Sequence, residues 1–400
     1  MITVIGCDAS PLPEPAAAAL EAASLVVGGQ RHLDQVTLPD GVATVVMGDV
    51  RPAVAAVLRH DGDKNGDAVV LASGDPGLFG IVRRLRAAGV QPVVHPAVSS
   101  VALAFARTGT PWDDALVVSA HGRDPRRALA ACRAVAPVAV LTDTVTGPAE
   151  VARAVADTSR ALVVCERLGE PDERVTWLSP AEAAQRYDWR EPNVVLVLDE
   201  PRPVDAAPGW VAGPRPLEGG WALDETDFDH RDQMITKAEV RAWVLARLAP
   251  RLGCLVWDVG SGSGSVAVEC ARFGAAVVAV ERDQQQRSRI QANARGLGVE
   301  VQVMIGNAPA VFDRLPDPDA VFVGGGGPSV VAAVAARSPQ RVVVALTALE
   351  RVGPTFDALA AADYSVDGVQ LQASRLTALP DGAHRLAATN PVIVVCGVRS

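Results

Sequence analysis

Short apolar runs recur along the chain and alternate with alanine-rich segments in which apolar residues follow helical spacing. Runs of this kind, bounded by Gly, Pro or Asp, are typical of strands buried on both faces, and the segments between them are long enough for helices. We therefore predict an α/β fold for the first half, with helices such as 52–59 and 78–88, and with strands at 2–6, 24–28, 68–72, 115–119, 137–141, 161–165 and 193–198.

The same alternation resumes in the second half, which predicts a second α/β sheet. Residues 364–376 and 391–398 follow one another without a helix between them, so they should pair as an antiparallel hairpin at the sheet edge. The other strands of this half are predicted at 255–259, 276–280, 299–303, 319–323 and 341–346.

A segment rich in proline and glycine separates the halves and has neither helical nor strand periodicity. We place a linker there, over 201–224, between a domain at 1–200 and a domain at 225–400. A length of 400 residues with 49% hydrophobic composition also favours two cores over one.

Composition excludes several classes of protein. The net charge is −9 without a dense basic run, so we expect no nucleic-acid partner. No apolar run reaches the roughly 18 residues that span a bilayer, so we expect no membrane insertion. The six cysteines form no C-x-x-C pair, which predicts a reduced, cytoplasmic protein without a metal site.

The most informative motif is Asp258-x-Gly260-x-Gly262-x-Gly264, which follows an apolar strand and precedes a helix over 265–272. Glycines allow the backbone to turn tightly and approach a ligand, and Glu281, 21 residues past Gly260, is spaced to accept hydrogen bonds from ribose hydroxyls. The motif therefore predicts a binding site for a nucleotide-shaped cofactor.

Two cofactors fit this spacing. Gly262-x-Gly264-x-x-Ala267 matches a dinucleotide fingerprint, whereas the acid at Asp258 resembles the first motif of class I S-adenosylmethionine (SAM) methyltransferases. We favour SAM, because the negative carboxylate of Asp258 would attract the positive sulfonium of SAM. The pyrophosphate of a dinucleotide is negative and offers no such attraction. A phosphate-binding Walker loop is excluded, since no lysine follows the glycines.

The first half carries motifs of its own: Val26 to His32, Ser73-Gly74-Asp75-Pro76, His95 to Ser100 and Val118 to Arg123. Together they resemble the tetrapyrrole (corrin/porphyrin) methylase family over roughly residues 1–200. The resemblance implies that Gly74 and Asp75, with Ser99 and Ser100, line a SAM pocket.

The first half also departs from that family. The family usually opens with a glycine-proline-glycine loop, and this chain has Gly6-Cys7-Asp8-Ala9-Ser10, with Ala97 also replacing a glycine. These side chains can narrow the cleft. His121 and Arg123, and with less support Arg31 and Arg107, are candidates for contacting substrate carboxylates, although a loop His can equally be structural.

The second half begins with Met234-Ile-Thr-Lys-Ala-Glu-Val-Arg241, where Thr236 and Glu239 predict a capping box at a helix start. The same string, followed by the Asp258 motif, Glu281-Arg282-Asp283, Gly306-Asn307-Ala308-Pro309 and Gly324 to Gly327, resembles the precorrin methyltransferase and decarboxylase domains of cobalamin biosynthesis.

This resemblance implies roles for individual residues. Thr236, Asn307 and Ala308 would contact SAM, and the open backbone of Gly324 and Gly325 would leave space beside its methyl group, unless the four glycines serve as a hinge. Lys237 and Arg231 would pair with substrate carboxylates. His230 would donate a proton during decarboxylation, or be structural.

Joined in this order, the two resemblances imply SAM-dependent methylation of a precorrin at carbons 5 and 15, with loss of the carboxyl group of the carbon-12 acetate, and we expect a homo-oligomer. Two alternatives stay open at this point. The first half can be a module that only holds the tetrapyrrole, or the second half can be a dinucleotide-dependent oxidoreductase.

Overall fold

The computed structural model describes residues 1–63, 65–199, 212–214, 219–231 and 235–399. The chain forms two compact units: unit 1 holds Met1–Arg123, Pro137–Arg153 and Arg160–Gly213, and unit 2 holds Asp124–Ala136, Ala154–Ser159 and Pro214–Ser400. Most of the predicted linker 201–224 lies outside the described residues. Among the described residues, no helix has both the length and the apolar character needed to cross a bilayer.

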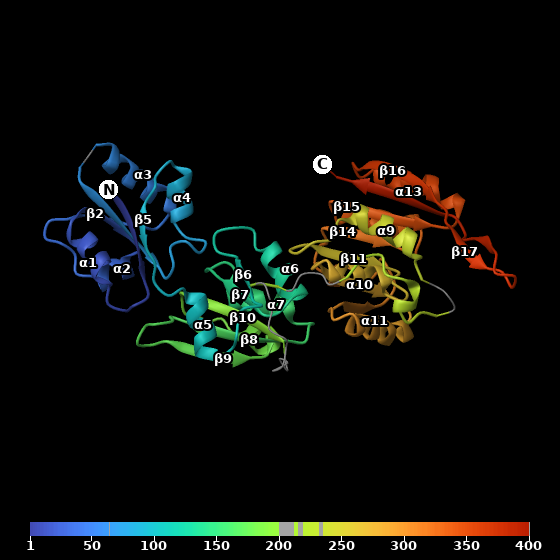
Figure 1. The fold of residues 1–400 in the computed structure, drawn as a ribbon, viewed down its shortest axis with the longest axis horizontal. Coiled ribbons are helices and arrows are strands. Elements are labelled where there is room, and N and C mark those ends of the chain that lie inside the picture. Colours follow the sequence, from blue (N-terminus) through green and yellow to red (C-terminus); the bar gives the residue numbers. More distant parts are fainter. Residues whose placement is uncertain (64, 200–211, 215–218, 232–234, 400) are drawn as a thin grey trace. The chain divides into compact units, whose positions relative to one another are not determined.

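Unit 1 begins with a five-stranded parallel sheet in the order β3-β2-β4-β1-β5. Alternate residues of its strands face two buried clusters, one closed by α3 and α4 and the other by α1 and α2 (Figure 1). The strands are β1 (Ile2–Cys7), β2 (Ala23–Gly28), β3 (Ala43–Val46), β4 (Asp67–Ser73) and β5 (Val93–His95), and the helices are α1 (Glu14–Glu21), α2 (Gln30–Gln35), α3 (Val50–Gly62) and α4 (Val82–Ala87).

A second sheet of unit 1 has the order β6-β7-β10-β8-β9 and is parallel only between β6 and β7. Helix α5 covers one face with Val101, Ala104 and Phe105. The strands are β6 (Leu116–Ser119), β7 (Val138–Leu141), β8 (Arg160–Glu166), β9 (Arg174–Leu178) and β10 (Asn193–Asp199); the helices are α5 (Ser100–Thr108), α7 (Pro148–Val155) and α8 (Pro180–Gln185).

Unit 2 is built on a seven-stranded sheet in the order β13-β12-β11-β14-β15-β19-β16. The first five strands are parallel, and β19 is antiparallel to both β15 and β16. The strands are β11 (Leu255–Val259), β12 (Ala276–Glu281), β13 (Gln302–Ile305), β14 (Ala320–Val323), β15 (Arg341–Leu346), β16 (Ser365–Leu371) and β19 (Val392–Val398).

Helices cover both faces of this sheet. Residues of α9, α10 and α11 share one buried cluster with the strands, and residues of α12 and α13 share the other. The helices of this unit are α6 (Arg126–Ala134), α9 (Ala238–Leu248), α10 (Ser265–Arg272), α11 (Gln284–Gly296), α12 (Pro328–Ala336) and α13 (Val352–Ala360), with 3-10 turns η1 (Glu225–Asp227), η2 (Phe312–Arg314) and η3 (Leu349–Arg351).

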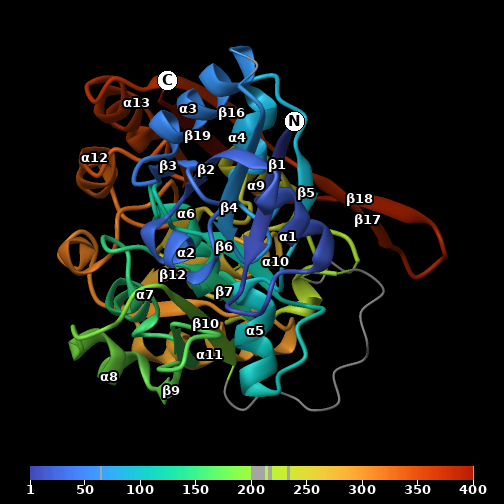
Figure 2. The same cartoon turned by 90° about the vertical axis from the view of Figure 1, so that its left-hand side faces the viewer.

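A separate hairpin of β17 (Ser374–Ala378) and β18 (His384–Ala388) leaves the sheet between β16 and β19 and extends away from it (Figure 2). The antiparallel pairing predicted for 364–376 and 391–398 is confirmed for 365–371 against 392–398, as β16 against β19. Residues 374–376 of the predicted segment belong instead to β17, and the apolar pattern does not indicate the β17–β18 hairpin.

Two element predictions were shifted. The strand predicted at 299–303 is β13 at 302–305, because Val299 still donates its amide to Ala294 in the turn that ends α11. The helix predicted at 78–88 begins only at Val82, because Phe79 has φ 53°, a left-handed conformation that a helix does not continue.

Candidate functional site

The carboxyl edge of the unit 2 sheet has a reversal of strand order next to β11. Strand β12 lies on one side of β11 and β14 on the other, and chain connections run outward from this point in both directions. The chain therefore leaves β11 and β14 in opposite directions, and open α/β sheets bind ligands at such a point of their carboxyl edge.

The loop after β11 depends on glycine at two points. Gly260 has φ 76°, and a Cβ there would lie 2.8 Å from the Gly325 amide nitrogen, so the loops after β11 and β14 touch through their backbones. Gly262 has φ 56° and open space where a Cβ would be. Of the three alternating glycines, Gly260 lines the cavity of this site, and Gly262 and Gly264 are not among its lining.

Asp258 is buried beneath this loop, with 1% of its surface exposed, and is not part of the cavity lining. Its Oδ2 accepts hydrogen bonds from Ser261 Oγ at 2.8 Å and from the Ala267 amide at 3.0 Å, while Oδ1 has no hydrogen-bond partner. Burial raises the pKa of Asp258 to about 6, against those two hydrogen bonds. Its carboxyl group thus connects the glycine loop to the start of α10.

Glu281 ends β12 and organises the same loop from the other side. Its Oε2 accepts from the Gly262 amide at 2.9 Å, and its Oε1 accepts from the amides of Arg282 and Asp283. A carboxylate has about four acceptor positions. Oε2 can therefore still accept a hydrogen bond from a ligand hydroxyl group.

These loops border a cavity of about 1160 Å³. That volume exceeds the range of roughly 300–1,000 Å³ that is usual for small-molecule sites, so it has room for a cofactor and part of a larger molecule. Of the residues predicted to bind a cofactor, the lining includes Thr236, Gly260, Glu281, Asn307, Ala308, Gly324 and Gly325.

The predicted substrate contacts of unit 2 separate in the structure. Lys237 lines the cavity, half-buried at the start of α9. Among the residues that the structure describes, the lining includes neither His230 nor Arg231. The neighbouring Asp229 donates its amide to Asn293 of α11, and the Nδ1 atom of His230 is buried without a hydrogen-bond partner.

The predicted capping box at α9 is wrong. The helix begins at Ala238 with Lys237 as N-cap, and no side chain caps it. Glu239 instead makes two hydrogen bonds to Arg375, and the carbonyl oxygen of Thr236 accepts from Arg241. Glu239 thus pairs with Arg375, which is far away in the sequence, and not with the nearby backbone that the capping-box spacing predicted.

The four successive glycines are partly a packing feature, and not only a source of open space. A Cβ on Gly324 would lie 2.9 Å from the Phe322 ring, and one on Gly326 would lie 2.9 Å from Val330, so both glycines allow close contacts. Gly327 has open space around it. The Gly326 carbonyl accepts a hydrogen bond of 2.8 Å from Arg351.

Sequence reasoning missed several lining residues. Arg351 and Thr355 lie at the start of α13, and Thr355 Oγ1 is buried without a hydrogen-bond partner. Gln372 and Asn390 lie at the base of the β17–β18 hairpin. No glycine or acidic motif marks these positions, and only the path of the chain brings them to the cavity.

The carboxyl edge of the first sheet in unit 1 is more tightly closed. The Gly74 amide donates to the Cys7 carbonyl at 2.8 Å, and the Ala97 amide donates to the Gly74 carbonyl at 3.4 Å. A Cβ on Gly74 would lie 3.1 Å from the Ser99 Cα and 3.3 Å from the Ser100 nitrogen. The predicted residues Gly74, Ser99 and Ser100 are thus brought together.

The polar side chains of these loops mostly bind backbone amides. Asp75 Oδ1 accepts from the Gly77 amide at 2.8 Å, and Ser99 caps α5 by accepting from the Ala102 amide. Asp8 Oδ2 accepts from the Val98 amide at 3.1 Å, and Ala9 has φ 66°. The residues that depart from the family's first loop therefore tie this loop to the loop after β5.

His121 and Arg123 follow β6 and are both exposed. His121 Nδ1 lies 3.2 Å from the Thr142 carbonyl, and the Arg123 guanidinium lies 5.7 Å from the centre of the Phe79 ring. Since Phe79 belongs to the loop after β4, Arg123 brings the two sheets of unit 1 together at their loops.

Arg31 and Arg107 are held by side chains of the second sheet. Arg31 donates to Ser73 Oγ at 2.5 Å and lies 3.6 Å from Glu170, whereas Arg107 makes two hydrogen bonds to Glu173. Both glutamates belong to the loop between β8 and β9. That loop therefore bridges the two sheets of unit 1.

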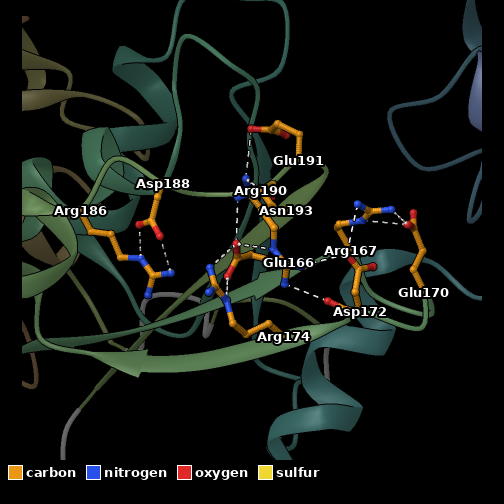
Figure 3. Close-up of polar contacts among 10 residues, drawn as sticks. All are labelled: Glu166, Arg167, Glu170, Asp172, Arg174, Arg186, Asp188, Arg190, Glu191 and Asn193. Carbon is orange, nitrogen blue, oxygen red and sulfur yellow. Dashed lines mark hydrogen bonds and ion pairs between the residues drawn. The ribbon is translucent and has the colours of Figure 1, made fainter.

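Figure 3 shows how this loop is anchored at Glu166, the last residue of β8. Glu166 is fully buried and accepts hydrogen bonds from Arg174 and from the Arg190 amide. Burial opposes its ionisation, but the Arg174 hydrogen bond and the Arg190 amide outweigh that effect and lower its pKa. The Arg190 side chain also donates to Asp172 at 2.9 Å, so the polar cluster joins β8 and β9 to the segment that precedes β10.

Among the described residues, no three His, Cys, Asp or Glu side chains are grouped as a metal ion would require.

Two family models match the chain. Residues 5–184 match tetrapyrrole (corrin/porphyrin) methylases, and residues 227–390 match a precorrin methyltransferase domain. With the glycine loop and its cavity, these matches define a chain that joins two methyltransferase domains of tetrapyrrole chemistry.

Curated relatives give the particular family. The chain is 35% identical over 344 residues to the precorrin-6Y C(5,15)-methyltransferase [decarboxylating] of Sinorhizobium sp, covering 82% of this chain and 78% of that protein. The chain belongs to this family of decarboxylating methyltransferases.

Relatives of single-domain length also match. Cobalt-precorrin-7 C(5)-methyltransferase of Salmonella typhimurium is 34% identical over 209 residues, which are 50% of this chain and all of that protein. The probable cobalt-precorrin-6B C(15)-methyltransferase (decarboxylating) of Pyrobaculum calidifontis is 34% identical over 171 residues, 40% of this chain and 87% of that protein.

Proposed function

We propose that this chain methylates precorrin-6Y at carbons 5 and 15 and removes the carboxyl group of its carbon-12 acetate, with SAM as methyl donor and no metal ion. The domain at 225–400 methylates carbon 15 and decarboxylates, and the domain at 1–200, joined by the linker 201–224, methylates carbon 5. The relatives support this division, because one of about half this length is named for carbon 5 and another for carbon 15 with decarboxylation.

The observation that carries the proposal is the unit 2 cavity with Glu281 and the glycine loop on its wall. A SAM molecule fits these residues: Gly260, Ser261 and Ser263 of the glycine loop line the cavity, and Glu281 Oε2 has acceptor capacity left for the ribose. Asn307, at the end of β13, can accept from the adenine amino group through its side-chain oxygen.

SAM supplies a methyl group on a sulfonium, which an electron-rich carbon of the macrocycle can attack in line. The protein's task is then mainly to position the carbon and exclude water, and alignment of this kind is worth on the order of 7–11 kcal/mol. Asp258 contributes indirectly, because its two hydrogen bonds hold the glycine loop in shape.

The cavity presents cations to the carboxylates of the substrate. Lys237, Arg282 and Arg351 line it, and Arg351 is held by the Gly326 carbonyl beside the proposed methyl-transfer position. In unit 1, Arg123 and His121 take the corresponding role for the carbon-5 site. His230 as proton donor, Arg231 as carboxylate partner, a homo-oligomer and a cytoplasmic location stay predictions.

Incubation of the full chain with precorrin-6Y and SAM, followed by mass spectrometry, tests the proposal. We expect a product with two added methyl groups and one lost carbon dioxide. A product with one methyl group and carbon dioxide loss would instead make the first half a holding module. No methylation, together with binding of a nicotinamide dinucleotide in place of SAM, would make the second half an oxidoreductase.

A further inference from the structure

The base of the β17–β18 hairpin forms one wall of the unit 2 cavity. Leu371, Gln372 and Ala373 lead into the hairpin and line the cavity, as do Thr389 and Asn390 on the way out. The two sides of the base are joined by the Thr389 amide, which donates to the Ala373 carbonyl at 2.9 Å. The position of the hairpin therefore decides the shape of this wall.

Arg375, two residues into the hairpin, connects it to the body of unit 2. Its guanidinium makes two hydrogen bonds to Glu225, at 2.7 and 2.9 Å, and two to Glu239, both at 2.8 Å. Two bidentate pairs on one arginine fix both the place and the plane of the group, which a lysine could not do.

Both glutamates are tied to the start of α9. Glu239 lies in the first turn of α9 and lines the cavity, and Glu225 also accepts a hydrogen bond of 2.8 Å from the amide of Ala238, the first residue of that helix. The residue before Ala238 is Lys237, the predicted carboxylate contact. One arginine thus sets the hairpin base against the segment that carries Lys237.

The charges give this link a second effect. Glu225 is almost fully buried, with 8% of its surface exposed, and Glu239 faces the cavity. Arg375 offsets one of the two negative charges that would otherwise repel an anionic substrate beside Lys237. The link thus shapes the wall and also reduces its negative charge, which favours a substrate that carries carboxylates.

We propose that Arg375 is a positioning residue for the tetrapyrrole: through Glu225 and Glu239 it holds the hairpin base and the Lys237 segment at the separation that the substrate requires. This inference rests on the proposed function, because it takes the substrate to be an anionic macrocycle. Arg375 itself acts through other residues and is not among the cavity lining.

The test compares Arg375→Met, Arg375→Lys and Arg385→Met in the full chain. Arg385 is an exposed arginine on β18 of the same hairpin, so its replacement removes the same charge without touching the link. Carbon dioxide release from precorrin-6Y gives KM and kcat, titration of precorrin-6Y gives its equilibrium affinity, and calorimetry gives SAM affinity and the unfolding temperature.

We expect Arg375→Met to raise KM and weaken precorrin-6Y binding about tenfold or more, with kcat and SAM affinity within about threefold of the parent chain. Arg375→Lys should recover part of the loss, and Arg385→Met should behave as the parent. Unchanged KM in folded Arg375→Met would overturn the inference, as would equal losses of SAM and substrate binding, which indicate general disruption. If the parent chain releases no carbon dioxide, the proposed function itself fails.

Discussion

The carboxyl edges of the two parallel sheets are built differently. In unit 2 the loops after β11 and β14 are joined where they begin, because the Gly324 and Gly325 amides donate to the Val259 carbonyl, and beyond that point they border a large cavity. In unit 1 the loops after β1, β4 and β5 are bonded to one another through the backbone at Cys7, Gly74 and Ala97. The unit 1 edge adds a hydrogen bond that joins the loops on the two sides of β1, from the Ala97 amide to the Gly74 carbonyl, whereas the loops of unit 2 border the cavity.

The difference indicates where each site is sensitive to substitution. Carboxylates shape the unit 2 loop, since Asp258 accepts from the Ser261 hydroxyl group and Glu281 accepts from the Gly262 amide. In unit 1 the acids at Asp8 and Asp75 are used for turns and loop contacts, and close backbone packing sets the geometry. Changes of charge should therefore act mainly on unit 2, and added volume mainly on unit 1.

The largest effect is expected for Gly6→Ala. The new Cβ would lie 2.1 Å from the Gly74 carbonyl oxygen and 2.6 Å from the Ala97 nitrogen, so the backbone of two loops must move. We expect unit 1 to lose more than about 3 kcal/mol of stability and the chain to lose carbon-5 methylation. Mass spectrometry should show a product with one methyl group and carbon dioxide loss; two methyl groups at the parent rate would contradict the comparison.

The pH dependence of stability in Asp258→Asn tests the role of a buried carboxylate in unit 2. Because burial raises the pKa of Asp258 to about 6, the folded state binds its proton more tightly than the unfolded state, and stability falls as pH rises from about 4 to about 6. Asn carries no charge, so the free energy of unfolding of Asp258→Asn relative to the parent chain should increase by up to about 3 kcal/mol as the pH rises across that window. Calorimetric unfolding at pH 4 and pH 7 measures it; a pH-independent difference would refute it.

Glu281→Gln should weaken SAM binding at the unit 2 site by about tenfold, because an amide group replaces an oxygen that accepts the Gly262 amide. Carbon-5 methylation should stay at the parent rate. Isothermal titration of SAM gives the affinities, and Glu350→Gln, an exposed acid outside the cavity lining, is the control. Equal weakening of both SAM sites would contradict the separation of the two edges.

The smallest expected effect is a gain in the stability of unit 1. Ala9 has φ 66°, which costs an alanine about 1 kcal/mol or more, so Ala9→Gly should stabilise unit 1 by about 0.5–1 kcal/mol after the added chain entropy. Ala18→Gly in α1 is the matched control and should destabilise by about as much. Unfolding temperatures compare the two; a loss for Ala9→Gly would show that the loop prefers the methyl group.

Much of the fold was predictable because its signals are local. The bounds of β11 and α10 match the predicted strand at 255–259 and helix at 265–272, since an apolar run ending in spaced glycines marks both ends. The β17–β18 hairpin escaped prediction because Leu376 and Leu386 are exposed and give no buried-strand pattern. The mainly antiparallel second sheet of unit 1 likewise depends on pairings between distant strands.

The candidate site, too, was predictable in its local features and not in its long-range contacts. The amino-acid sequence alone established two α/β halves, the glycine loop and the acid 21 residues beyond Gly260, because covalent spacing places such groups at one turn and the next strand end. Only the tertiary structure decided that Asp258 turns under the loop and that Arg375 meets Glu239 and Glu225, 136 and 150 residues away. Side-chain partners so distant depend on the path of the whole chain, which no local pattern contains.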